Sequence, residues 1–216
     1  LAPDLGYVLK GQEITFQAGC EALSKLTSGK VYLGLDGNGD ADVASIFTGV
    51  TGVEKYYFRG KHPIGNVGVQ IHHIKPISPE DKVWTINVQD VAIIGKFMLE
   101  GIVDQTRMLA ITGAELKNTG YAKVPFGASM SDLLSSEEVT DEHRIISGDV
   151  LSGTQVSKEG FVGFYDDQVT IVAEGKNYEL FGWLLPLDMR PSVSKTFPST
   201  LLGGVASAAN TNNRGE

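Results

Sequence analysis

The chain has 216 residues, of which 42% are hydrophobic and 20% are charged, and its formal net charge is -8. This composition is typical of a soluble globular protein with one or two domains. An acidic chain without a cluster of lysine and arginine is not expected to bind nucleic acid or to place a basic helix on a membrane surface. Its apolar runs are shorter than the roughly 20 residues that span a bilayer, so no transmembrane segment is expected. The single cysteine, Cys20, excludes an intrachain disulfide and an iron–sulfur cluster held by cysteines, and it indicates a reducing compartment.

The two ends of the sequence suggest that it belongs to a longer protein. The chain begins at Leu1 rather than at a methionine, and no signal-peptide pattern follows. It stops at Glu216 after a small and polar run that starts at Gly203. We interpret the chain as a fragment, in which a site that needs the missing parts would be incomplete.

Residues 1–103 alternate between helical and extended patterns. The apolar residues between Val8 and Leu26 recur at helical spacing, and Gly29 follows as a C-cap. Further along, the patterns predict strands at Lys30–Leu35, Val53–Phe58 and Val83–Val88, and helices at Asp42–Phe47, Gly65–Ile74 and Gln89–Glu100, the last ended by Gly101. Repeats of this length predict a mostly parallel sheet with crossover helices.

From Asp104 the pattern changes to short strands and turns. A short helix is predicted at Ser129–Leu134, where Ser129 and Asp132 come close to a capping box. Strands are predicted at Arg107–Thr112, Tyr121–Val124 and His143–Ser147. This ββαβ order suggests a β-grasp-like module. A hairpin around Gly175-Lys176 is predicted to follow, with arms at Gln168–Glu174 and Tyr178–Leu185.

The predicted fold class is therefore α/β plus α+β. It comprises an α/β region over 1–103, a β-grasp module over 104–156, a β-hairpin extension over 157–190, and a loop or tail over 191–216.

Two patterns invite a metal, and neither predicts one. The acidic loop Asp36–Asp42 offers oxygens at alternate positions like the start of a calcium loop, but Ala41 and Phe47 stand where such a loop needs Gly and Glu. We interpret it as a polar turn. The histidines His62, His72 and His73 have no cysteine or acidic residue at zinc spacing. The adjacent pair on a helix would diverge by about 100 degrees, so we predict one packed and one exposed ring and no metal.

A turn with glycines at Gly60, Gly65 and Gly68 precedes the predicted helix over Gly65–Ile74. Glycine allows the backbone to approach a ligand, and a helix N-terminus favours anions. The spacing matches neither GxGxxG nor a P-loop, and Pro63 lacks an N–H donor. The turn is therefore a place for a ligand or for contact with another subunit, but it does not identify the ligand.

No catalytic nucleophile is convincing. Cys20 lies in an apolar helix and is expected in the core. Ser147 and Ser152 lack a G-x-S-x-G elbow, and His143 follows an acidic run that we interpret as a solvated loop.

Several aromatic residues follow Lys158 on predicted strands. We interpret them mainly as hairpin core rather than as a quinone or flavin pocket, with a face that binds a partner protein as the second option. They are Phe161, Phe164, Tyr178, Phe181 and Trp183.

Five segments resemble the A subunit of the bacterial Na+-translocating NADH:quinone reductase. They are Ala18-Gly19 with Leu23–Tyr32, Gly60–Val69, Trp84–Lys96, Arg144–Gly153 and Glu179–Trp183. The resemblance runs in order over nearly the whole chain. The sequence is more distantly similar to the C subunit of the electron-transport complex and to the NADH-binding flavoprotein subunit of complex I. In those relatives the region like Trp84–Pro125 joins a Rossmann-like domain to a soluble ligand-binding β-grasp domain.

The resemblance implies a peripheral subunit on the cytoplasmic face of the inner membrane. The whole complex would use NADH, flavins, an iron–sulfur cluster and quinone, and would export Na+. The flavin-binding stretch and cluster cysteines of the complex I relative are absent here. We therefore expect no cofactor on this chain, and no catalytic residue is carried over. The implied partners are the other subunits, especially the integral membrane subunit with the quinone site, and quinone itself.

Three hypotheses remain: an interaction subunit that docks on membrane partners, a quinone-binding module, and a vestigial nucleotide or flavin binder. For a quinone or interface site we favour the turn residues His62, Pro63, Gly65, Asn66 and Gly68. Asn87 and Gln89 are the next choice, because they would follow the end of a strand, the edge at which open α/β sheets bind ligands.

Overall fold

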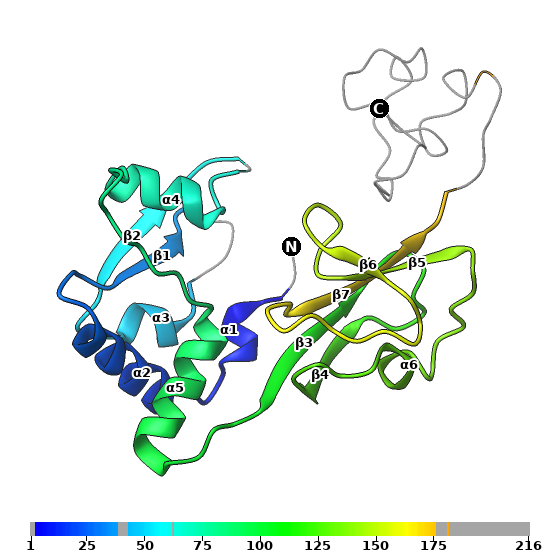
Figure 1. The fold of residues 1–216 in the computed structure, drawn as a ribbon, viewed down its shortest axis with the longest axis horizontal. Coiled ribbons are helices and arrows are strands. Elements are labelled where there is room, and N and C mark those ends of the chain that lie inside the picture. Colours follow the sequence, from blue (N-terminus) through cyan, green and yellow to red (C-terminus); the bar gives the residue numbers. More distant parts are fainter. Residues whose placement is uncertain (1–2, 39–42, 62, 176–180, 182–216) are drawn as a thin grey trace. The chain divides into compact units, whose positions relative to one another are not determined.

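The computed structural model describes residues 3–38, 43–61, 63–175 and 181 (Figure 1). The chain divides into two compact units, of which the first is Asp4–Gln105 and the second contains the sheet that begins at Thr106. Within the described ranges, every helix is too short or too polar to span a bilayer.

The first unit contains five helices and two strands in the described residues. In chain order they are α1 (Leu5–Val8), α2 (Glu13–Leu26), β1 (Tyr32–Asp36), α3 (Ser45–Gly49), β2 (Glu54–Phe58), α4 (Val67–Ile74) and α5 (Val88–Glu100). The predicted strands at 30–35 and 53–58 and the predicted helices at 65–74 and 89–100 are confirmed, and Gly101 ends α5 in the left-handed conformation at φ 72°. Gly29 is not a C-cap, because α2 ends at Thr27, whose hydroxyl accepts a hydrogen bond from the Gly29 N–H.

β1 and β2 run parallel, with α3 between them in the chain. Leu33 and Leu35 share a face with Lys55 and Tyr57, their partners in the register. Leu35 is buried on this face, and the Lys55 ammonium donates to the carbonyl of Thr48 in α3 at 2.6 Å. The connection is therefore the strand–helix–strand unit that the sequence pattern predicts.

The helices α2 and α5 pack so closely that only glycine fits at two positions. A Cβ atom on Gly95 would lie 1.7 Å from the carbonyl oxygen of Thr15, and one on Gly19 would lie 2.0 Å from that of Val91. Beside this contact Phe16 is fully buried and meets Phe47 of α3 edge to face at 5.5 Å. The backbone contact of α2 with α5 is thus a main element of the core of this unit.

The predicted strand Val83–Val88 is wrong. Residues 81–87 form no strand, Val88 begins α5, and the Trp84 side chain is 92% exposed. The alternating pattern is real, but a strand needs a neighbour to complete its hydrogen bonds. In the part of the chain that the structure describes, this segment pairs with neither β1 nor β2.

In its described residues the second unit contains a five-stranded sheet and one short helix. Its elements are β3 (Thr106–Thr112), β4 (Gly120–Pro125), α6 (Met130–Leu133), β5 (His143–Ser147), β6 (Thr154–Val156) and β7 (Gln168–Ala173). The order in the sheet is β4-β3-β7-β5-β6. β3 and β7 are parallel, and every other pair is antiparallel. β7 therefore occupies the centre of the sheet.

A hydrophobic cluster of described residues stabilises this sheet. Leu109, Val169 and Ile171 from the central strands pack with Met130 and Leu134 at α6, and all five are fully buried. The predicted strands and short helix of this region are confirmed, although Ser129 caps α6 without a side-chain hydrogen bond to the helix. Its hydroxyl bonds to that of Ser131 instead, so the predicted capping box is wrong. The first arm of the predicted hairpin forms β7, and the second arm, Tyr178–Leu185, falls almost wholly outside the described residues.

Candidate functional site

The turn before α4 is anchored to the loop after β1 by one side chain. The ladder continues one residue past β1, since the Gly37 N–H donates to the carbonyl of Phe58 at the end of β2 at 2.8 Å. Asn38 then accepts from the Gly60 N–H through Oδ1 at 2.8 Å, and its Nδ2 lies 3.4 Å from the Gly60 carbonyl oxygen. Gly60 has a φ of 152°, which favours glycine. Asn38 thus holds the carboxyl ends of β1 and β2 together.

Beyond Gly60 the chain makes two tight turns and enters α4. The Ile64 N–H donates to the Lys61 carbonyl at 3.1 Å, and the Asn66 N–H donates to the Pro63 carbonyl at 2.8 Å. Asn66 occupies the N-cap position but makes no side-chain cap. First-turn amides of a helix that lacks such a cap are suited to an acceptor from another molecule.

The two later glycines of this turn are not required by packing. A Cβ atom on Gly65 or Gly68 would meet no atom within 4 Å, and both residues are exposed. The structure therefore brings Pro63, Gly65, Asn66 and Gly68 together on one exposed turn, while His62 lies outside the described residues. Figure 1 shows α4 at the end of the sheet toward which both arrowheads point.

Asn87 and Gln89 lie elsewhere in the unit, at the start of α5. The Asn87 side chain caps this helix by accepting from the Gln89 N–H at 3.0 Å, and Gln89 is 5% exposed. No strand precedes them, so the reason for expecting a ligand there is removed. In Figure 1 α5 lies beside α2, away from α4. Both residues therefore have a structural role, because they start α5, the helix that packs on α2.

Sequence reasoning missed two residues that shape the turn. The sequence places Asn38 in a polar loop, although an Asn two residues beyond a strand commonly bonds to nearby backbone. Gln70 of α4 lies over β1, where a Cβ atom on Gly34 would be 2.3 Å from its Oε1. Its Nε2 lies 3.4 Å from the Ile64 carbonyl oxygen. No short motif marks Gln70 in the sequence.

The described histidines and Cys20 do not form a reactive centre. His72 and His73 are both exposed, with ring centroids 5.8 Å apart, so the prediction of one packed ring is wrong. Among the residues that the structure describes, no group of three His, Cys, Asp or Glu could hold a metal ion. Burial raises the pKa of the Cys20 thiol to about 11, with the Glu21 carboxylate adding to the shift. The thiol is therefore protonated at neutral pH and is not a nucleophile.

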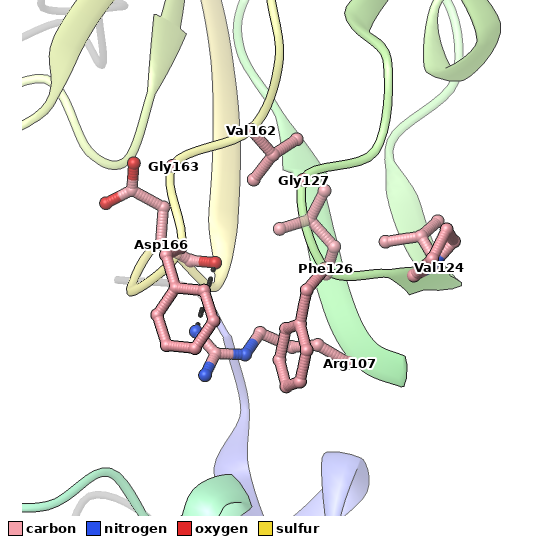
Figure 2. A pocket seen from close by; sticks show the side chains of 10 residues that line it. Arg107, Val124, Phe126, Gly127, Val162, Gly163 and Asp166 are labelled. Carbon is pink, nitrogen blue, oxygen red and sulfur yellow. Dashed lines mark hydrogen bonds between the residues drawn. The ribbon is translucent and has the colours of Figure 1, made fainter. Parts of the chain in front are cut away.

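A small hollow in the second unit contains aromatic and charged groups (Figure 2). The Arg107 guanidinium lies 5.1 Å from the centre of the Phe126 ring, and its Nη1 lies 3.4 Å from the Asp166 carbonyl oxygen. Ser147 donates to the Asp166 carboxylate at 2.5 Å and accepts from the Gly163 N–H at 2.8 Å. The space inside, about 10 Å³, admits about one water molecule. These contacts stabilise the loop after β6 and leave no room for a quinone ring.

The aromatic residues of that loop point outward. Phe161 and Phe164 are 64% and 59% exposed, and Tyr165 is also exposed. The interpretation of Phe161 and Phe164 as hairpin core is therefore wrong. The loop pairs with the segment before α6, where the Val162 N–H donates to the Ala128 carbonyl at 2.9 Å, and it leaves both rings largely exposed. Phe181 is exposed too, while Tyr178 and Trp183 lie outside the described residues.

An open apolar groove lies between α2 and α3 in the first unit. Its volume is about 360 Å³, within the range of small-molecule sites. Apolar side chains line it at Ile14, Ile46 and Val50. Polar side chains line it at Glu13, Gln17 and Ser45. The Gln17 amide is held in place by the Thr51 backbone, whose N–H donates to Oε1 at 2.9 Å.

Two family models match the chain. The NqrA second alpha/beta domain matches residues 1–103, and the NQRA C-terminal domain matches residues 108–158. Both matches are collinear with the structure: the first covers α1 to α5, and the second covers β3 to β6.

Three curated relatives are similar over most of the chain, and each is named as the A subunit of a Na(+)-translocating NADH-quinone reductase. The protein of Vibrio atlanticus is 35% identical over 205 residues, 94% of this chain and 45% of the relative. That of Shewanella frigidimarina is 37% identical over 198 residues, 91% of this chain and 43% of the relative. That of Actinobacillus pleuropneumoniae serotype 5b is 36% identical over 199 residues, with 91% and 44% covered. The chain spans about half the length of the curated relatives it matches.

Proposed function

The chain belongs to the family of A subunits of the Na+-translocating NADH-quinone reductases, and from this premise we propose that it acts in such a complex as a peripheral subunit on the cytoplasmic face of the bacterial inner membrane. Its role there is assembly: it docks on the other subunits, including the integral membrane subunit with the quinone site. The complex passes electrons from NADH to quinone and exports Na+. Identity of 35% and 37% to named subunits supports this proposal.

The architecture proposed with this function is a Rossmann-like region over 1–103 and a β-grasp module that begins at 104. The parallel β1–α3–β2 unit supports the first assignment. For the second, the support is a mixed sheet in which the first and last strands, β3 and β7, lie side by side and parallel at its centre. The module extends beyond 156, because β7 belongs to this sheet.

The contact that we propose for docking is the turn that contains His62, Pro63, Gly65, Asn66 and Gly68. The supporting observation is a contrast within this turn. Its start is fixed by the hydrogen bond from the Gly60 N–H to Asn38, whereas Gly65 and Gly68 are exposed and are not required by packing. A backbone that is already fixed by hydrogen bonds loses little entropy when it binds, which favours association.

Charge substitutions in open positions test the docking contact. Gly65→Glu adds a carboxylate where a side chain meets no atom, so the fold should be retained while a close contact is blocked. Gly120→Glu at the start of β4 makes the same change at another exposed position where a Cβ atom meets no neighbour, and it is the control. We expect the Gly65 variant to lose at least tenfold in co-purification with the other subunits, and the control to keep it. Equal recovery of both variants would contradict the proposed contact.

Quinone binding is a second candidate function, favoured by the volume and apolar lining of the α2–α3 groove. A short-chain quinone titrated into the protein should then quench tryptophan fluorescence to saturation. Weakening by Ile14→Ser, an exposed position in the groove, would place the quinone there, and weakening by His62→Ala would place it at the turn. A quench that never saturates would reject both.

We also propose that the chain holds no cofactor of its own. The absorbance of the purified protein tests this directly. A flavin spectrum would overturn it and would favour a vestigial nucleotide or flavin binder.

A further inference from the structure

Gly34 leaves a gap on one face of the two-stranded sheet, and the side chain of Gln70 in α4 fills it. Side chains alternate along a strand, so Tyr32 lies on the same face as Gly34, together with Tyr56, the partner of Gly34 in β2. The two tyrosine rings contact each other edge to face, with centroids 5.8 Å apart. A Cβ atom on Gly34 would lie 2.3 Å from the Gln70 Oε1 and 3.0 Å from its Cδ. The Gln70 carboxamide therefore lies on the backbone of β1, in a space that exists because residue 34 has no side chain.

The same carboxamide reaches the turn before α4. Its Nε2 donates to the Ile64 carbonyl at 3.4 Å, and the Gln70 backbone N–H donates to the Asn66 carbonyl at 3.1 Å. The side chain of Ile64 lies beside Gly60, where a Cβ atom would be 3.7 Å from the Ile64 Cβ. Ile64 is therefore the residue through which Gln70 holds this turn.

Two amide side chains thus hold the two ends of the turn. Asn38 bonds to Gly60 at its start, and Gln70 bonds to Ile64 near its end. Both depend on β1, because Asn38 follows this strand in the chain and Gln70 lies on Gly34. A turn that is held at both ends presents its exposed backbone in one arrangement, which lowers the entropy that it loses on binding.

We propose that Gln70 is a positioning residue of the docking turn, and that residue 34 is glycine because a side chain there would displace the Gln70 carboxamide from Ile64. This rests on the proposed function, which makes the turn a docking contact. The three atoms nearest to a Cβ atom on Gly34 all belong to the Gln70 carboxamide. A side chain at position 34 therefore moves the end of a flexible side chain and leaves the pairing of β1 with β2 in place. A change in β1 is thus felt in the turn.

Amide exchange of the isolated chain tests the positioning role without any partner. We expect Gln70→Ala to speed exchange at Ile64 and Asn66 about three- to tenfold, as the loss of one hydrogen bond allows. Gln70→Glu keeps the size of the side chain but replaces the donor with an oxygen, so it should have the same effect. His73→Ala, at an exposed position of the same helix, is the control. Unchanged exchange at Ile64 in both Gln70 variants would overturn the proposal, and so would equal acceleration in the α2–α5 contact, which would indicate a general loss of stability.

Gly34→Ala tests whether the two positions act together. The variant should speed exchange at Ile64 by about the same factor as Gln70→Ala. The double variant should show no further increase, because the carboxamide is already displaced in each single variant. Additive effects of the two substitutions would overturn the link between Gly34 and Gln70.

Co-purification with the other reductase subunits separates this proposal from the proposed function. Gln70→Ala should lower the recovery by about the factor by which it speeds exchange, and His73→Ala should keep it. Full recovery with Gln70→Ala, while Gly65→Glu loses it, would overturn the positioning role and leave the docking contact intact. Full recovery with both Gln70→Ala and Gly65→Glu would overturn the docking contact as well.

Discussion

The α2–α5 contact and the turn before α4 each contain two glycines, and the two pairs serve different purposes. At Gly19 and Gly95 the backbone of the opposite helix occupies the place of a side chain. At Gly65 and Gly68 that place is open. The first pair is therefore required by the fold, whereas nothing in the fold requires the second pair. Glycines that packing does not explain are the better guide to a contact with another molecule.

The largest effect is expected for Gly95→Ala. The new Cβ atom would overlap the Thr15 carbonyl, so α2 and α5 must separate. We expect a loss of unfolding free energy at the upper end of the range of about 1–3 kcal/mol for overpacking. Urea denaturation measures it, with Gly49→Ala in α3 as the control. A loss of similar size in the control would show that the tight contact is not the cause.

A smaller loss is expected for Asn87→Ala, which removes the side-chain cap of α5. Caps of this kind contribute about 0.5–2 kcal/mol. Asn87→Asp keeps an oxygen for the Gln89 N–H and should retain most of the stability in the same urea experiment. If the aspartate variant is as unstable as the alanine variant, Asn87 has a role other than capping.

The effect of Asn38→Ala should be local. The substitution removes the acceptor of the Gly60 N–H, and one such hydrogen bond contributes about 0.5–1.5 kcal/mol. We expect faster amide exchange at Gly60, with little change in α2 and α5. Asn38→Asp keeps an acceptor and should give an intermediate rate. An unchanged rate at Gly60 would show that Asn38 does not hold the turn.

The smallest effect, with the opposite sign to Gly95→Ala, is expected for Gly68→Ala. Alanine in a helix interior is favoured over glycine by about 0.8–1.0 kcal/mol, and we expect a smaller gain in the first turn of α4, where Gly68 lies and the new Cβ atom meets no neighbour. Thermal unfolding should therefore show a small gain in stability. A loss would mean that this glycine is required by the fold, and the contrast between the two pairs would fail.

The sequence predicted most elements because local patterns decide them. The apolar spacing in α5 and the glycine at its end do not depend on distant contacts. The failure at Val83–Val88 shows the limit: β-branched and aromatic residues fit a strand, but no neighbour is present to pair with them. The central position of β7 also depends on distant contacts, since its partners β3 and β5 lie far away in the sequence.

For the candidate site, sequence located the turn but not what holds it. The glycine spacing and the helix start are visible as a pattern. The link between Asn38 and Gly60 joins residues 22 positions apart, and the contact of Gln70 with Gly34 depends on how α4 lies on the sheet. The prediction of a site at Asn87 and Gln89 locates a helix start correctly, but it relies on a preceding strand that the structure does not have at residues 81–87. The Asn87 side chain accepts from the Gln89 N–H and so caps α5.

The most direct test of the account is amide exchange at Gly65, Asn66 and Gly68, measured in the assembled reductase and in the isolated chain. A docking contact at this turn predicts that these amides exchange at least tenfold more slowly in the complex, while the amides of the α2–α5 contact are equally slow in both. If the amides of this turn exchange equally fast in the complex and in the isolated chain, the turn is not the surface through which this protein docks.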